Sequence, residues 1–173
     1  QEKAILSKII EQKKRDPKQP LIIITESPLE NHSLHRCLTQ YSSKWVIQQF
    51  EGYEQLGQTQ AFIIHNAGLD YSSTTATKCF MRGIHTDTMH EDGFGLLNAC
   101  TNITPVEFEQ IKGRVARAGK KGWFQSIINT AKLGVLAEHP EGIEVAFRLH
   151  QESIASNNQN ERLKTKVLEK CHF

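Results

Sequence analysis

The stretch LIIIT, residues 21–25, gives the clearest indication of the fold class, because it is a short apolar run in which four residues are β-branched. Branching at Cβ favours extended backbone, where the side chains pack well against their neighbours. A continuous apolar run, without alternation, is typical of a strand buried on both faces, as in a parallel sheet. The stretch therefore predicts a central strand with helices on both sides.

The segment before this strand predicts an amphipathic helix over residues 2–15. Leu6, Ile9 and Ile10 fall on one helical face, while lysines occupy the other. The sequence DPKQP, residues 16–20, ends the helix, since its prolines cannot continue one.

The segments after the strand continue an alternation of helix and strand. Residues 26–41 predict a helix, with Leu34 and Leu38 four apart and either Ser27 or Asn31 as its N-cap. Further strands are predicted at residues 44–50, 72–80, 95–101 and 123–129, and further helices at 61–68 and 105–119. Such alternation predicts an α/β layered fold around a parallel sheet.

The character of the chain changes near residue 131. Apolar residues and one histidine then recur at helical spacing, namely Ile143, Phe147, His150 and Ile154. We therefore expect one α/β domain over residues 1–130 and a helical C-terminal extension over residues 131–173, which packs on a partner.

Composition and charge restrict the class of protein. The 173 residues carry 38% hydrophobic and 23% charged side chains and a net charge of only +2, too small to indicate nucleic acid or membrane by bulk electrostatics. No apolar run approaches the roughly 20 residues of a membrane span, and we expect no signal peptide. Because the chain opens on Gln1, not Met, we expect a piece of a longer protein.

The metal-ligating residue types are scattered. Cysteines stand at positions 37, 79, 100 and 171, with no C-x-x-C pair, so we expect reduced thiols and a cytoplasmic location. The tightest histidine clusters, His32 with His35 and His85 with His90, lack a matching carboxylate or cysteine pattern. The sequence therefore predicts no metal site.

One segment carries candidate chemistry, EFEQIKGRVARAGKKG, residues 107–122. Arg114 and Arg117 stand three apart, so on a helix their planar guanidinium groups point the same way. Two guanidinium groups aimed together suit a phosphate chain. A solvated basic face, or pairing of Arg114 with Glu107 or Glu109, are the structural alternatives.

Three motifs in order resemble the second RecA-like domain of superfamily-two helicases and of the related SecA protein-translocation motor. The family's Q-x-x-G-R-x-x-R-x-G motif is matched at all five fixed places, by Gln110, Gly113, Arg114, Arg117 and Gly119. The sequence AGLDYSSTTATK, residues 67–78, is similar to the SecA pattern A-G-x-x-x-x-V-T-I-A-T-N, and LIIITES, residues 21–27, to the family's v-L-v-g-T-x-S segment. The resemblance covers roughly residues 3–130 and implies a three-layer RecA-like fold.

The chain departs from the family after residue 78. Where the family continues M-A-G-R-G-T-D, this chain has CFMRGIHTD, residues 79–87: Arg82 and Gly83 hold their places, but Met81 replaces a glycine. His85 stands in the register of the acid that touches the nucleotide sugar, and Asp87 lies two residues on. Either an insertion brings Asp87 to the same spot, or the sugar contact is lost.

The resemblance implies half of an ATPase site. In the family, ATP and Mg²⁺ are held by a first RecA-like lobe, whose G-x-x-x-x-G-K-[ST] loop and D-E-x-D strand do not occur here. It implies Arg117 as arginine finger, Arg114 as a second phosphate contact and Gln110 as a link to the γ-phosphate. Gly113, Arg82, Gly83 and Asp87 would complete the nucleotide-binding set. The isolated chain is then not expected to hydrolyse ATP.

Partners and alternatives follow from the same residues. The moved substrate would be a polypeptide, favoured by the AG and TTAT matches, or a nucleic acid. A non-catalytic RecA-like scaffold for protein binding is the alternative function, favoured by Met81 and the displaced acid. A third interpretation, a small-molecule enzyme of doubly wound fold, is disfavoured because this chain has no glycine-rich dinucleotide fingerprint after its first strand.

Other residues carry weaker signals. Thr77 and Arg82 would couple nucleotide to the moving substrate, or else be a strand end and a solvated arginine. Trp45, Phe50 and Tyr53 could stack on bases, but aromatic residues at this density favour a core interpretation. Lys120 and Lys121 are predicted to be surface residues.

Overall fold

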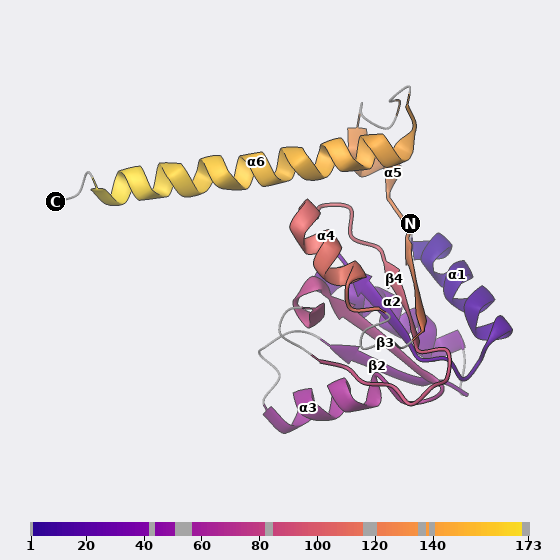
Figure 1. The fold of residues 1–173 in the computed structure, drawn as a ribbon. Coiled ribbons are helices and arrows are strands. Elements are labelled where there is room, and N and C mark those ends of the chain that lie inside the picture. Colours follow the sequence, from indigo (N-terminus) through magenta and orange to yellow (C-terminus); the bar gives the residue numbers. More distant parts are fainter. Residues whose placement is uncertain are drawn as a thin grey trace. The chain divides into compact units, whose positions relative to one another are not determined.

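The computed structural model describes residues 2–41, 44–50, 57–81, 85–115, 121–134, 138 and 141–170 (Figure 1). The chain forms two compact units. The first comprises Gln1–Cys100 and Gln110–Ile128, and the second comprises Thr101–Glu109 and Asn129–Phe173.

The first unit is built on a five-stranded parallel sheet, which confirms the predicted α/β fold class. The strands are β1 (Leu21–Thr25), β2 (Val46–Phe50), β3 (Ser72–Thr77), β4 (Phe94–Asn98) and β5 (Gly122–Ser126). Their order is β2-β3-β1-β4-β5, so β1 lies at the centre and all five of its residues are buried. The predicted strand over residues 72–80 ends at Thr77, where a 3₁₀ helix, η1 (Lys78–Met81), begins.

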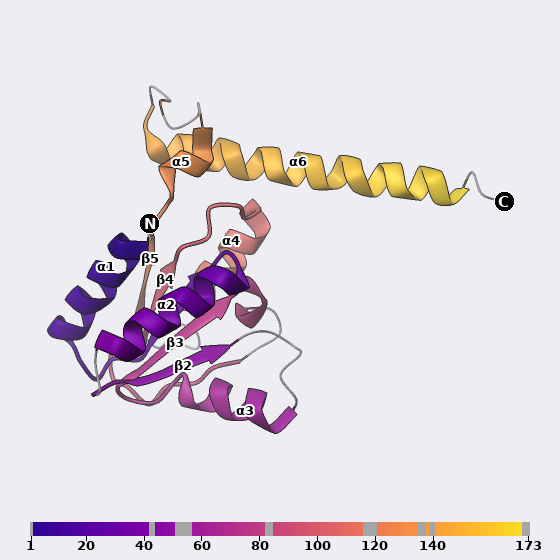
Figure 2. The same cartoon turned by 180° about the vertical axis from the view of Figure 1, so that it is seen from behind.

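Helices cover both faces of the sheet. α1 (Glu2–Arg15) and α2 (Pro28–Tyr41) lie on one face, which faces the viewer in Figure 2. Their apolar residues form one core cluster with the strands: Ile5, Ile9, Leu21, Ile23, Leu34, Leu38, Leu97 and Ala99. α3 (Gly57–Asn66) lies against the other face, where the Gln48 amide donates to the Ile63 carbonyl at 2.8 Å and to Thr74 Oγ1 at 2.7 Å.

The buried stripe of α1 differs from the prediction. Ile5, Ile9 and Lys13 are buried, while Leu6 and Ile10 are half-buried. The Lys13 ammonium is accommodated because it donates to the carbonyl oxygens of Gln19 at 2.7 Å and Ser72 at 2.8 Å. Burial lowers the pKa of Lys13 from 10.5 to about 8. A lysine thus ties the end of α1 to the start of β3.

Ser27, one of the two predicted caps, is the N-cap of α2. Its Oγ accepts a hydrogen bond from the Glu30 amide at 3.2 Å, and Glu30 Oε2 accepts one from the Glu26 amide at 3.2 Å. The Ser27 hydroxyl therefore caps the helix, while the Glu30 carboxylate holds the residue before the cap. Asn31 is instead buried inside the helix and donates to the Phe50 carbonyl at 2.9 Å, so it holds α2 to the end of β2.

Phe50, at the end of β2, belongs to the core, and Trp45, just before β2, packs against it, as the core interpretation predicts. Phe50 is fully buried and meets Phe80 edge to face, with ring centroids 4.9 Å apart. Trp45 packs on the core cluster and stacks on Tyr41 at 5.9 Å. Tyr53 lies outside the described residues, so its role stays a prediction.

The second unit is helical, with α5 (Thr130–Leu133) and α6 (Ile143–Lys170). The rings of Phe108 and Phe147 meet edge to face at 5.5 Å, and His150 Nε2 lies 3.0 Å from Asn102 Oδ1. Residues 101–109 therefore group with the C-terminal residues. The predicted division between residues 130 and 131 stays a prediction.

Candidate functional site

The predicted motif residues lie at the end of α4 (Pro105–Lys112) and in the turn that follows it. Thr104 caps the helix: its Oγ1 accepts from the Glu107 amide at 3.2 Å, and Glu107 Oε2 accepts from the Thr104 amide at 3.1 Å. Gln110 is exposed in the last turn. Thr104 and Glu107 thus form a capping box, which was not predicted from the sequence.

α4 ends at Lys112, before Arg114, so the predicted helix over residues 105–119 is wrong at residues 113–115, where a turn follows. The Arg114 amide donates to the Ile111 carbonyl at 3.1 Å and the Val115 amide to the Lys112 carbonyl at 3.2 Å. These are three-residue spacings that tighten a helix end. Gly113, at the point of change, is a poor helix former. Because Arg114 lies in this turn and not in α4, the predicted alignment of Arg114 with Arg117 along one α-helix is not supported at Arg114.

Arg114 is half-buried, and its Nε is buried. Arg117 and Gly119 lie outside the described residues, so the paired-guanidinium geometry stays a prediction. Gln110 and Gly113 are both exposed. Gln110 and Gly113 are therefore open to solvent, whereas Arg114 is only partly so.

The predicted residues at and after the end of β3 do not all lie at the same edge of the sheet. Thr77 ends β3 at the carboxyl-terminal edge and is buried. The backbone of Asp87 instead lies against Gly68, which precedes β3: a Cβ added to Gly68 would stand 1.6 Å from the Asp87 carbonyl oxygen. The exposed Asp87 carboxylate lies 3.2 Å from His85 Nε2. Arg82 and Gly83 lie outside the described residues.

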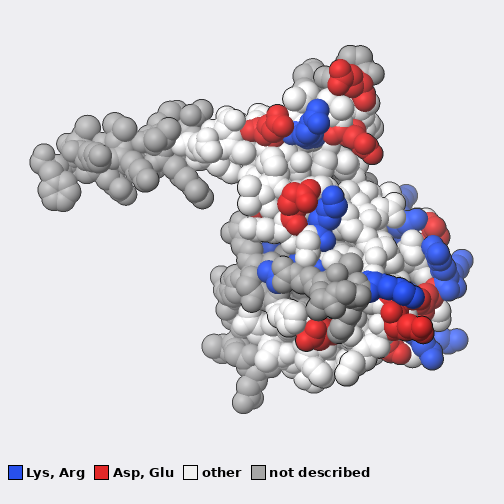
Figure 3. Space-filling view, in the orientation of Figure 1, with Lys and Arg blue, Asp and Glu red and all other residues white. Residues whose placement is uncertain are grey.

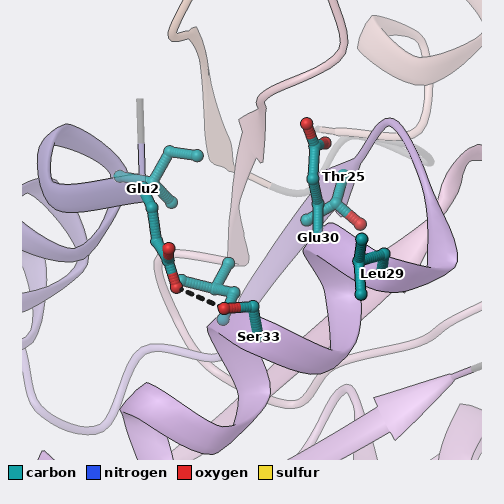
Figure 4. A pocket seen from close by; sticks show the side chains of 7 residues that line it. Glu2, Thr25, Leu29, Glu30 and Ser33 are labelled. Atoms are coloured by element: carbon teal, nitrogen blue, oxygen red, sulfur yellow. Dashed lines mark hydrogen bonds between the residues drawn. The ribbon is translucent and has the colours of Figure 1, made fainter.

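A cavity of about 290 Å³ opens at the carboxyl end of β1, between α1 and the start of α2 (Figure 4). The lining residues are Glu2, Ile5, Thr25, Leu29, Glu30, Ser33 and Leu34. After β1 the chain leads through α2 to β2, whereas after β4 it leads through α4 to β5, on the opposite side. In open parallel sheets this divergence marks the edge where ligands bind.

Two carboxylates border this cavity: Glu2 accepts hydrogen bonds from α2, and Glu30 accepts one from the residue before the cap of α2. Glu2 Oε1 accepts from Ser33 Oγ at 2.8 Å, the contact drawn in Figure 4, and from Cys37 Sγ at 3.4 Å. The Glu2 carboxylate raises the pKa of the Cys37 thiol, because the thiol donates to it. Glu30 Oε2 accepts from the Glu26 amide. The cavity therefore has a negative rim over an apolar lining.

This cavity was not predicted from the sequence. The S-x-x-E spacing of Ser27 and Glu30 marks the start of a helix, but Glu2 joins the site from a helix that begins 25 positions before Ser27. No local pattern connects residues so far apart. Only the packing of α1 beside α2 brings the two carboxylates to one opening.

Metal-ligating clusters and membrane-spanning helices are both missing from the part of the chain that the structure describes. Within these residues, no group of three or more His, Cys, Asp or Glu side chains is placed to hold a metal ion. Among the same residues, none of the helices combines the length and apolar character required to cross a membrane.

Comparison with known proteins identifies the fold. No protein-family model and no curated protein matches the chain. Among solved structures, the chain is similar to domain 2 of the DEAD-box helicase Mss116p, in a structure bound to an RNA duplex. The TM-score is 0.58 at 21% sequence identity, over 81% of this chain and 55% of that one.

The fold is RecA-like. At this level of identity the likeness establishes the fold and leaves the activity open. The chain spans only 55% of the length of the helicase chain that it matches. Nothing in the match distinguishes a SecA-like from a helicase-like RecA-like domain.

Proposed function

We propose that this RecA-like domain is the second lobe of an ATP-driven motor, which completes the ATP site of a first lobe. One observation carries the proposal: the Q-x-x-G-R segment spans the end of α4 and the turn that follows it, on the way to β5 of a parallel sheet ordered β2-β3-β1-β4-β5. The strand order and the arginine motif support the proposal independently, because the order of strands in the sheet does not depend on which residues follow α4.

In this proposal Arg117 is the arginine finger, Arg114 a second phosphate contact and Gln110 a polar link to the γ-phosphate. ATP bound to the first lobe, with its Mg²⁺, supplies the phosphoryl group that is transferred to water. The guanidinium groups stabilise negative charge on the transferred group, where a fixed positive donor acts strongly because water is excluded. Attraction between the lobes then depends on the bridging phosphates, so that nucleotide controls closure.

The remaining predicted contacts lie in the segment after β3. Arg82 and Gly83 are proposed to face the nucleotide from this segment. Asp87 is not used as the sugar contact, because its backbone lies beside Gly68 at the amino-terminal edge, away from the end of β3. The helicase-like sugar contact is then absent, which favours weak binding of nucleotide by this lobe alone.

A polypeptide is the better candidate for the moved substrate. The carboxylates of Glu2 and Glu30 border the cavity at the carboxyl end of β1 and would repel nucleic-acid phosphates. On the face shown in Figure 3, described basic and acidic side chains are interspersed on the side of α1, without a continuous basic stripe. Stimulation of ATP turnover by unfolded polypeptide but not by RNA would support this choice.

Substitution of the finger tests the proposal in a protein that contains both lobes. Arg117→Ala is expected to lower ATP turnover by about 10³–10⁵-fold, because the transition state loses its positive donor. Binding of ATP should change only a few-fold. The measurements are steady-state hydrolysis and equilibrium binding of a fluorescent ATP analogue.

Lys121→Ala is the matched control, since it removes a nearby positive charge whose ammonium pairs with Asp92 at 3.0 Å. Turnover of this variant should equal that of the wild type. Wild-type turnover in Arg117→Ala would refute the finger assignment. Absence of hydrolysis with both lobes intact would instead favour the non-catalytic scaffold, which the position of Asp87 also favours.

A further inference from the structure

A second hollow lies at the amino-terminal edge of the sheet, on the opposite side from the cavity at Thr25. Its volume is about 460 Å³, and three connecting segments surround it: the turn after α1, the turn between α3 and β3, and the segment before β4. The lining residues are Lys18, Gly68, Leu69, Asp70, Met89, His90 and Glu91.

Backbone contacts fix the three segments to one another. The Tyr71 amide donates to the Lys18 carbonyl at 2.7 Å, and Tyr71 holds a left-handed φ of 64°, which is uncommon for a residue other than glycine. Gly68 approaches the Asp87 carbonyl so closely that no side chain would fit. The His90 amide donates to Thr88 Oγ1 at 3.1 Å, and the His90 ring lies 3.5 Å from an Asp16 oxygen. The hollow is therefore built on ordered backbone.

Two exposed apolar side chains, Leu69 and Met89, line this hollow, and Tyr71 directly follows Asp70, which also lines it. Met89 is 98% exposed, Leu69 is 47% exposed and Tyr71 is 39% exposed. Single exposed apolar residues are ordinary, but a group around one hollow indicates a contact surface. Methionine and tyrosine are also enriched in protein interfaces. Met89 is almost fully exposed and, together with Leu69, lines the hollow.

Charges of both signs share the same surface. Lys18 stands on one side of the hollow, and Asp70 and Glu91 also line it. Among the described residues, none of these three side chains makes an ion pair with another. The surface thus offers a projecting apolar residue, a hollow, a cation and two anions together.

We propose that this surface, defined by Lys18, Leu69, Asp70, Met89 and Glu91, binds the same surface of a second copy of the chain. A two-fold interface requires a patch that is complementary to itself. Here Met89 of each copy would enter the hollow of the other, while Lys18 of each copy would meet Asp70 or Glu91 of the other. A uniformly acidic or basic partner would meet like charges on part of the surface.

Sedimentation velocity over a range of protein concentrations tests this proposal without nucleotide. The wild-type chain should show a reversible monomer–dimer equilibrium. Met89→Glu should weaken the dimer at least tenfold, because it would place two carboxylates in the two hollows. Since Met89 is almost fully exposed, this substitution should leave folding intact, as checked by circular dichroism.

Phe62→Glu is the matched control, because Phe62 is 66% exposed on α3 and does not line the hollow. This variant should dimerise like the wild type. A wild-type chain that stays monomeric at every concentration would overturn the proposal. Equal weakening by Phe62→Glu and Met89→Glu would overturn it as well.

A charge exchange identifies the occupant of the surface. Lys18→Glu should weaken the dimer, and so should the double variant Asp70→Lys with Glu91→Lys. A mixture of these two proteins should form a heterodimer, because the acidic surface of the first then faces the basic surface of the second. Failure of the mixture to associate would show that a second copy is not the partner. Neither result bears on ATP turnover, so this test is independent of the proposed motor function.

Discussion

The neighbouring central strands β1 and β3 are equally buried but have opposite chemistry. All five residues of β1 are buried and four of them are aliphatic; all six residues of β3 are buried and five of them carry hydroxyls. Ile23 of β1 pairs in register with Thr75 of β3. The contrast shows that the position of a strand in the sheet sets its burial, whereas side-chain chemistry sets how the burial is stabilised.

The hydroxyls of β3 are accommodated in different ways. Ser72 Oγ donates to the Ala67 carbonyl at 2.9 Å, and Thr74 Oγ1 accepts from the Gln48 amide at 2.7 Å. The Oγ of Ser73 and the Oγ1 of Thr75 are buried without a hydrogen-bond partner among the described residues. Each such group costs about 1–3 kcal/mol. Apolar burial in β1 therefore stabilises the fold, whereas the buried hydroxyls of Ser73 and Thr75 in β3 lower its stability.

The greatest loss of stability is expected from a change in β1. Ile23→Ala should lower the free energy of unfolding by about 2–5 kcal/mol, because it leaves a cavity in the core cluster beneath α1 and α2. Urea denaturation of the whole chain measures the change. Val46→Ala, at a 53% exposed position of β2, is the control and should cost less than about 0.5 kcal/mol. A cost for Ile23→Ala no greater than that of the control would remove the distinction between the two strands.

An intermediate effect concerns Lys13, whose ammonium reaches the first residue of β3. The folded-state pKa of about 8 is below the ordinary value of 10.5, so the unfolded chain binds more protons between these pH values. The free energy of unfolding should therefore rise with pH in this window, by up to about 1.4 kcal/mol per pH unit, relative to Lys13→Met. Denaturation of both proteins at a series of pH values across this window measures the difference. Parallel curves would contradict burial of this ammonium.

A change in β3 should have the least effect of the three. Thr75→Val keeps the branched shape and removes a buried hydroxyl that has no partner among the described residues. The free energy of unfolding should stay within about 1 kcal/mol of the wild type, or rise. The same urea titration measures it beside Ile23→Ala. A loss clearly beyond this range would show that the hydroxyl has a bonding partner, and the contrast with β1 would then weaken.

Much of the fold could be predicted from short segments of sequence. The strand at residues 21–25, the helix at 2–15 and the cap at Ser27 all lie where local patterns indicate. Threonine content indicated β3 correctly, although hydrophobic periodicity could not, because β3 has no aliphatic stripe. The end of that strand at Thr77 was missed, since no breaker marks it.

The candidate site was predictable only in part. The arginine motif could be recognised from the spacing of its residues in the sequence. The end of α4 at Lys112 could not, because it depends on how Gly113 and Arg114 fit their surroundings. Burial of Lys13 was missed, because a lysine on a helix is ordinarily exposed, and its burial is tolerable here because the ammonium donates to the carbonyls of Pro17, Gln19 and Ser72.

Local sequence was enough to set the order of helices and strands, the parallel α/β class and the spacing of the arginine motif, because each depends on residues close together in the chain. Long-range packing alone set the strand order, the burial of Lys13, the cavity between Glu2 and Glu30, and the hollow beside Met89. These features join residues tens of positions apart. Their contacts form only when the parallel sheet brings distant segments to a common edge.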